Sequence, residues 1–219
     1  MQVILVRHGE TASNRDRLAL GRNDVPLNDL GLRQARRLAA WLEGGPARPR
    51  ITGLYSSPLA RARQTAEAIG ERLGLTVVEA AELTEMDVGE MDGLSGPELR
   101  ERHPGFMRAW FSREAGTARM PGGESLAEVQ ERAWPFLERL RDEHGAEAAV
   151  VVVSHNFVTR ALVCKALAMD LADFRRFEQE LASVTRIEFR GPRTLVTALN
   201  ETCHLGGLDR EPDYWAERG

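Results

Sequence analysis

Three apolar runs in this sequence of 219 residues each end in polar side chains that can bind an anion. These side chains are Arg7 and His8 after the first run, Ser57 and Arg61 after the second, and His155 after the third. Imidazole and guanidinium groups suit the same ligand, because both donate hydrogen bonds and guanidinium adds a fixed positive charge. The pattern therefore predicts a site for a dianion, of which phosphate is the obvious candidate.

Each of these residues alone has an ordinary explanation. Arg7 alone would be a surface cation, His8 a core or capping histidine, and Arg61 one more charge on a solvated helix face. His155 alone could cap the helix that follows it. The prediction depends on their joint placement, because ligands of open α/β sheets bind beyond the carboxyl ends of the strands. Helix N-termini add partial positive charge at the same edge.

Alternating strands and helices must position these side chains. Continuous apolar runs, above all "AEAAVVVVS" (146–154), are typical of parallel strands buried on both faces. The spacing predicts strands at 2–6, 51–57, 75–80 and 146–154, helices at 29–43, 58–73 and 157–168, and a final strand pair at 183–189 and 194–199. Asn28 and Ser57 are the expected N-caps. The order indicates an α/β fold with a mostly parallel sheet.

The segment 84–125 is expected to form a loop and a small cap over one end of the sheet. It is rich in Glu, Asp and Gly up to residue 97 and then has helical spacing to 114, interrupted at His103. Ser125 and Glu128 match a capping box that opens a long helix to about Glu143. Pro135 lies inside this helix and is expected to kink or break it.

Composition narrows the function classes. The formal net charge of −4 argues against nonspecific binding to nucleic acid or to an anionic membrane. The longest apolar run is too short to span a bilayer, and the first residues do not have the pattern of a secretory signal. Cys164 is expected to be a reduced core thiol, while a disulfide with Cys203 stays open. A cytoplasmic location is the default expectation.

Several segments resemble the histidine phosphatase superfamily, the phosphoglycerate-mutase-like enzymes. "LVRHGET" (5–11) resembles its signature, and five further segments follow in the family's order. They are "GRNDVPLNDLGLRQA" (21–35), "SSPLARARQTA" (56–66), "LTEMDVGEMDG" (83–93), "PGGES" (121–125) and "VVVSHNFVTRAL" (151–162). "NETCHL" (200–205) is also similar. The resemblance implies a three-layer sandwich, with helices on both faces of a mostly parallel sheet.

The resemblance also implies roles for individual residues. His8 would be the nucleophile that becomes phosphohistidine, and Glu85 would be the proton donor to the leaving oxygen. Arg7, Arg61 and His155 would hold the phosphate oxygens. The substrate-binding residues would be Asn14, Leu20, Gly21, Glu124 and Asn156. From spacing alone, Glu85 is equally well one more acid on a solvated loop.

Two features depart from the commonest family pattern. Asn156 stands where the family often has Gly after the second catalytic histidine, which is expected to change the shape of the pocket. "GEMDG" (89–93) replaces a more usual aromatic-acid pair, so that specificity is expected to shift. Gly9 is expected to let the backbone approach the phosphate closely.

The length of the lid favours a phosphatase over a mutase. Only residues 94–121, 28 in all, separate Gly93 from Gly122. Cofactor-dependent mutases resemble one another in a long insertion here, which shields the phosphohistidine from water. A shorter lid excludes less solvent. We therefore expect a metal-independent phosphomonoesterase that hydrolyses a small phosphorylated metabolite, with a phosphoglycerate mutase as the alternative.

Two other classes are weaker alternatives. One is an inactive module that binds a phosphorylated ligand, and the other is a metal-dependent hydrolase. We expect one domain over 1–204 with a tail at 205–219, no cofactor and no metal. The expected partner is a small phosphate ester, with no nucleic acid and no membrane. A homodimer is kept as an option, because Tyr214 and Trp215 in the tail could pack on a second subunit.

Overall fold

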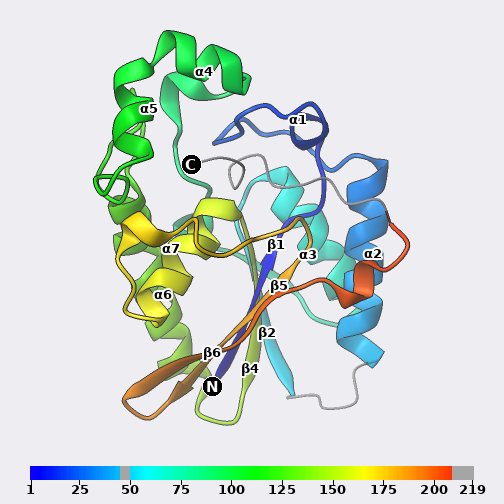
Figure 1. Cartoon of the computed structure of the whole chain (residues 1–219). Helices are drawn as coiled ribbons and strands as arrows, with labels where there is room; N and C mark the ends of the chain where they lie inside the picture. Colours follow the sequence, from blue (N-terminus) through cyan, green and yellow to red (C-terminus); the bar gives the residue numbers. More distant parts are fainter. Residues whose placement is uncertain (45–49, 209–219) are drawn as a thin grey trace.

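The computed structural model describes residues 1–44 and 50–208 and shows a central six-stranded sheet (Figure 1). The strand order is β3-β2-β4-β1-β5-β6. The strands are β1 (Gln2–Arg7), β2 (Ile51–Ser56), β3 (Val77–Glu79), β4 (Ala149–Ser154), β5 (Val184–Arg190) and β6 (Arg193–Glu201). The first four are parallel, and the last two form the predicted antiparallel pair. The predicted α/β fold is confirmed.

Helices cover both faces of the sheet because its inner strands are apolar on both sides. In β1, Ile4 and Val6 face a core with α2 (Asp29–Gly44) and α3 (Ala60–Leu73). Val3 and Leu5 face a second core with α6 (Leu126–His144) and α7 (Asn156–Ala166). The two cores give the three layers that Figure 1 shows.

The predicted cap lies over the carboxyl ends of the strands. It contains α4 (Gly96–Arg102) and α5 (Pro104–Trp110), drawn in green above the sheet in Figure 1. Trp110 is fully buried and packs against Phe157 and Phe174, so it belongs to the core. Phe111 is 44% exposed. A short helix, α1 (Ala12–Arg15), lies near the same end of the sheet.

Some local expectations were wrong. The helix expected at 58 begins at Ala60, and its N-cap position is occupied by Leu59 instead of Ser57. The break that was one option at Pro135 is absent, because α6 is continuous over its 19 residues from Leu126 to His144, while a kink there stays a prediction. Ser125 and Glu128 form the predicted capping box, and Asn28 Oδ1 accepts the Gly31 N–H as expected of an N-cap.

Both cysteines are free thiols, with Cys164 buried and Cys203 exposed. Within residues 1–44 and 50–208, no helix is both long and apolar enough to cross a membrane. Most of the predicted tail, from residue 209 onward, lies outside the described residues.

Candidate active site

Parallel pairing brings the ends of three strands together. Arg7 at the end of β1 pairs with Ser154 at the end of β4, and the His8 N–H donates to the Ser154 carbonyl at 3.0 Å. The rings of His8 and His155 therefore lie side by side, with centroids 5.1 Å apart. On the other side of β4, Ser56 of β2 pairs with Val153. The predicted convergence of histidines and arginines is present.

His8 has one nitrogen available for attack. Its Nδ1 lies 2.7 Å from the Gly9 carbonyl, and because a carbonyl only accepts, Nδ1 must carry the proton. In the neutral ring, Nε2 then holds the lone pair. Burial lowers the pKa of His8 well below its usual value, and the charges of Arg61 and Arg7 lower it further. His8 is therefore neutral at neutral pH, with the lone pair on Nε2.

Gly9 is explained by packing against α2. A Cβ on Gly9 would lie 2.6 Å from the Gly31 carbonyl oxygen, and one on Gly31 would lie 2.1 Å from the Glu10 carbonyl oxygen. The two glycines let the chain after β1 touch the first turn of α2. This contact fixes the backbone next to His8, and the close approach of Gly9 to a phosphate stays a prediction.

The two arginines are aimed by backbone carbonyls. Arg61, fully buried, donates to the carbonyls of Gly21 at 2.6 Å and Asn23 at 2.9 Å. Its Nε is buried without a hydrogen-bond partner among the described residues. Burial lowers the pKa of Arg61 to about 10, so the group stays charged at neutral pH. Arg7 donates to the Gln179 carbonyl.

His155 is fixed by a serine. Its Nε2 lies 2.7 Å from the Ser57 hydroxyl oxygen, and both residues are fully buried. Within the described part of the chain, His155 Nδ1 is buried and unsatisfied, which makes it a polar atom that a phosphate oxygen would satisfy. Burial is the main cause that lowers the pKa of His155, followed by Arg61 and His8.

Glu85 lies in the same buried region, with 3% of its surface exposed. Its Oε1 accepts the Met86 N–H at 2.8 Å, and its Oε2 accepts the Phe157 N–H at 3.3 Å from the first turn of α7. Burial raises the pKa of Glu85 and outweighs these N–H groups and the nearby arginines, which lower it. A buried carboxyl that keeps its proton can act as a general acid.

The predicted substrate-binding residues occupy different places. Asn14 belongs to the cap of α1, where its Oδ1 accepts from the N–H and hydroxyl of Thr11. Gly21 aims Arg61 through its carbonyl, and Leu20 next to it is partly buried. Asn156 accepts from Arg160 at 2.9 Å, while its Nδ2 is buried and lacks a partner in the described structure.

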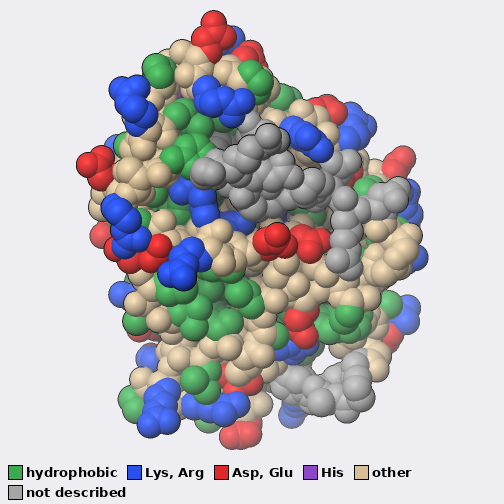
Figure 2. All heavy atoms as spheres, in the orientation of Figure 1, with side chains coloured by type: hydrophobic (Ala, Val, Ile, Leu, Met, Phe, Trp, Pro, Cys, Tyr) green, Lys and Arg blue, Asp and Glu red, His purple; other side chains and the backbone are tan. Residues whose placement is uncertain are grey.

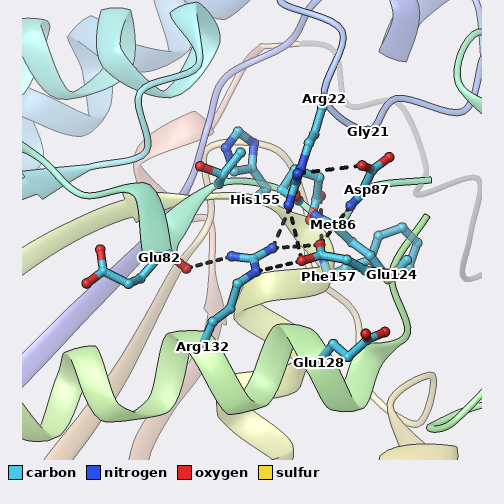
Figure 3. A network of polar contacts seen from close by, with 12 residues as sticks. Gly21, Arg22, Glu82, Met86, Asp87, Glu124, Glu128, Arg132, His155 and Phe157 are labelled. Atoms are coloured by element: carbon cyan, nitrogen blue, oxygen red, sulfur yellow. Dashed lines mark hydrogen bonds and ion pairs between the residues drawn. The ribbon is translucent and has the colours of Figure 1, made fainter. Parts of the chain in front are cut away.

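Glu124 is held by cations instead of facing open space. Arg132 of α6 contacts both of its oxygens at 3.1 Å, and Arg22 contacts one at 3.1 Å (Figure 3). The same carboxylate accepts the Asp87 N–H at 2.9 Å. Sequence reasoning missed Arg22, Arg132 and the role of Ser57. Arg22 and Ser57 could have been found, because they lie inside segments that resemble the family. For Arg132 the only sequence signal is its position on the charged face of a helix.

The face of the molecule in Figure 2 has no single charge sign among the described residues. Among the described residues on the face in Figure 2, Lys and Arg side chains alternate with Asp and Glu. Positive charge is instead concentrated in the buried guanidiniums of Arg7 and Arg61 and at the N-terminus of α7. This distribution suits a small anion that enters the site.

Comparisons with known proteins agree with this geometry. The model of the histidine phosphatase superfamily (branch 1) matches residues 3–202. Phosphoserine phosphatase 1 of Hydrogenobacter thermophilus is 37% identical over 94% of this chain and 95% of its own. Phosphoglycerate mutase-like protein 4 of Arabidopsis thaliana is 38% identical over 74% of this chain and 69% of its own.

A solved structure shows the same fold. A phosphoserine phosphatase mutant from Entamoeba histolytica, in complex with phosphoserine, superposes with a TM-score of 0.83. It is 27% identical in sequence, and the match covers 93% of this chain and 98% of that one. With the family match over nearly the whole chain, the chain belongs to branch 1 of the histidine phosphatase superfamily and is a phosphoric monoester hydrolase.

Proposed function

We propose that this protein hydrolyses small phosphate monoesters in two steps, through a phosphohistidine formed on His8. The observation that carries the proposal is the orientation of His8. Its Nδ1–H is held by the Gly9 carbonyl, its pKa is lowered by burial and by Arg61, and its Nε2 is left with a lone pair. This is the protonation state that a nucleophilic imidazole needs.

In the first step, His8 Nε2 forms a bond to phosphorus as the bond from phosphorus to the ester oxygen breaks. Negative charge on the phosphoryl oxygens is stabilised by Arg7 and Arg61, with His155 as a further donor. Glu85 gives its proton to the departing oxygen, which leaves as an alcohol. The raised pKa of Glu85 supports this role, because the carboxyl must be protonated to donate.

In the second step, Glu85 is a carboxylate and takes a proton from water. The oxygen of that water bonds to phosphorus as the bond from His8 Nε2 to phosphorus breaks. Inorganic phosphate is released with His8 neutral and Glu85 protonated again. This chain's own cations provide the positive charge that the transition state requires.

Phosphoserine is the first substrate to test, since the relatives named above include two phosphoserine phosphatases. We propose that the substrate class is small phosphorylated hydroxy acids. The alternative is a phosphoglycerate mutase, as one relative's name suggests. The short segment 94–121 supports hydrolysis, because a short lid shields the phosphohistidine less from water.

Two other expectations stay proposals. A cytoplasmic location is supported by the two free cysteines, which suit a reducing compartment. The homodimer rests on tail residues outside the described structure, and sedimentation of the full chain tests it.

The test measures phosphate release and isomerisation in the same reactions. Purified protein is given phosphoserine, 3-phosphoglycerate and a sugar phosphate, and kcat/KM is compared among them. The proposal expects phosphate release from phosphoserine to be fastest and to exceed any conversion of 3-phosphoglycerate to its 2-isomer. Isomerisation faster than release would establish the mutase instead.

A further inference from the structure

Arg132, in the middle of α6, connects this helix to the loop that carries Glu85. Its Nη1 donates to the Glu82 carbonyl at 2.6 Å, and its Nη2 donates to the Glu85 carbonyl at 3.2 Å. Figure 3 shows the guanidinium between α6 and the loop. One planar group thus holds the backbone at two points, three residues apart, and the second point is the residue proposed as proton donor.

Glu124 holds the guanidinium in place. Its two carboxylate oxygens accept hydrogen bonds from Arg132 Nε and Nη2, which is a bidentate geometry with strong directional preference. The side chains are mostly shielded from solvent, with 21% of Arg132 and 17% of Glu124 exposed. Glu124 also takes the Asp87 N–H, which ties the backbone just after Glu85 to the same carboxylate. Arg22 reaches the Glu85 carbonyl only at 3.5 Å.

We infer that Arg132 is a positioning residue for the proton donor Glu85, an inference that rests on the proposed function. The Glu85 carboxyl is held by the N–H groups of Met86 and Phe157, and these contacts require the Glu85 backbone to stay in place. Lysine cannot replace this fork, because a single ammonium cannot match bidentate geometry and also reach two carbonyls.

The leaving group distinguishes positioning of an acid from a general structural role. An alkoxide leaving from phosphoserine needs the proton, whereas p-nitrophenolate leaves well without it. Arg132→Met is expected to lower kcat/KM roughly 10- to 100-fold for phosphoserine and less than about 3-fold for p-nitrophenyl phosphate. Arg132→Lys is expected to recover only part of the loss and provides a second variant if Arg132→Met does not fold.

Arg139 supplies the matched control. It lies two turns later on α6 and contacts the side chain of Glu82 at 2.8 Å instead of a backbone carbonyl of the loop. Arg139→Met is expected to change kcat/KM less than about 2-fold for both substrates. A double-mutant cycle then tests the path of the effect. In a Glu85→Gln background, Arg132→Met is expected to lower kcat/KM for phosphoserine by less than about 3-fold, because the acid is already absent.

The outcomes separate the two proposals. Glu85→Gln can lower kcat/KM more for phosphoserine than for p-nitrophenyl phosphate while both Arg132 variants lower kcat/KM equally for the two substrates. In that case Arg132 does not position the acid, and only this inference is wrong. An undiminished effect of Arg132→Met in the Glu85→Gln background would overturn it in the same way. If Glu85→Gln itself lowers kcat/KM equally for both substrates, the proton-donor assignment is wrong and the inference fails with it.

Discussion

The Ser57 hydroxyl oxygen and His155 Nε2 lie 2.7 Å apart, although 98 residues separate them in the chain. Ser57 directly follows β2 and His155 directly follows β4, so the pairing of these two strands creates the contact. The contact orients the imidazole and leaves Nδ1 as its unsatisfied atom within the described structure. A residue that resembles an N-cap in the sequence thus contacts a buried histidine of the candidate active site.

Ser57→Ala is expected to lower kcat/KM about 10-fold, the effect of one lost hydrogen bond of about 1–1.5 kcal/mol. The loss should be similar for phosphoserine and p-nitrophenyl phosphate, because His155 is proposed to bind the phosphate oxygens and not the leaving group. Ser57→Thr keeps the hydroxyl and is the control. A loss confined to phosphoserine would show that Ser57 acts on proton transfer instead.

Removing the proposed acid is expected to change the pH profile. Glu85 is active when protonated, so kcat/KM for phosphoserine should fall as the pH rises through its pKa, which burial raises above the usual range. Glu85→Gln should lower the maximal kcat/KM of the pH profile by 100-fold or more, which is within the range that general acids contribute to rates. It should also remove the decline of kcat/KM at alkaline pH. Profiles of kcat/KM from pH 5 to 9 provide the check. If kcat/KM of Glu85→Gln still declines at alkaline pH, the decline is due to the titration of another group and not of Glu85.

The buried histidines are expected to make folding stability fall in mild acid. In the unfolded chain, His8 and His155 take up protons as the pH falls through about 6.5. Burial holds their folded-state pKa well below that value, so the unfolded state binds more protons and the free energy of unfolding decreases. Each histidine contributes a loss of up to about 1.4 kcal/mol between pH 7.5 and 5.5.

Urea unfolding at these two pH values measures the loss, with His8→Asn as the comparison. Between these pH values, the part of the stability loss that comes from the two histidines should be about half as large in the variant as in the wild type, because only His155 remains. The raised pKa of Glu85 acts in the opposite direction and is the same in both proteins. An identical loss in the variant and the wild type would contradict a neutral buried His8.

The contact between Gly31 and the chain after β1 is expected to tolerate no side chain. A Cβ at Gly31 would lie 2.1 Å from the Glu10 carbonyl oxygen, so Gly31→Ala must move the backbone next to His8. We expect a loss of about 2 kcal/mol or more in the free energy of unfolding. Gly44 ends the same helix, and a Cβ added there would meet no atom of the described residues within 4 Å beyond its chain neighbours and the helix backbone. Gly44→Ala should therefore change the free energy of unfolding by less than about 0.5 kcal/mol. Equal effects in urea unfolding would contradict this packing.

Much of the fold was predictable because it depends on local patterns. Continuous apolar runs identified the inner strands, helical spacing identified α2, and the capping box at Ser125 and Glu128 identified α6. The start of α3 was predicted two residues early, because Ser57 and Pro58 are typical of a helix start. In the folded chain the Ser57 hydroxyl is used by His155, a long-range contact that no local pattern encodes. The unbroken course of α6 through Pro135 likewise follows from its packing in the core.

The site was predictable only where residues follow strands. His8, Arg7 and His155 directly follow or end β1 and β4, so parallel pairing suffices to bring them together. The contacts that Arg132 makes with the Glu85 loop come from the middle of a helix and go to backbone carbonyls, which carry no residue identity. Such a partner is visible only once the loop and the helix are placed together.

Rapid quenching in alkali, in which phosphohistidine is stable, shows directly whether His8 carries the phosphoryl group. Protein is mixed with ³²P-labelled phosphoserine, quenched within milliseconds and digested, and the labelled peptide is identified. We expect an acid-labile, alkali-stable label on His8 that turns over as fast as phosphate appears, and no label in His8→Asn. A label on another residue, or full hydrolysis by His8→Asn, would contradict it.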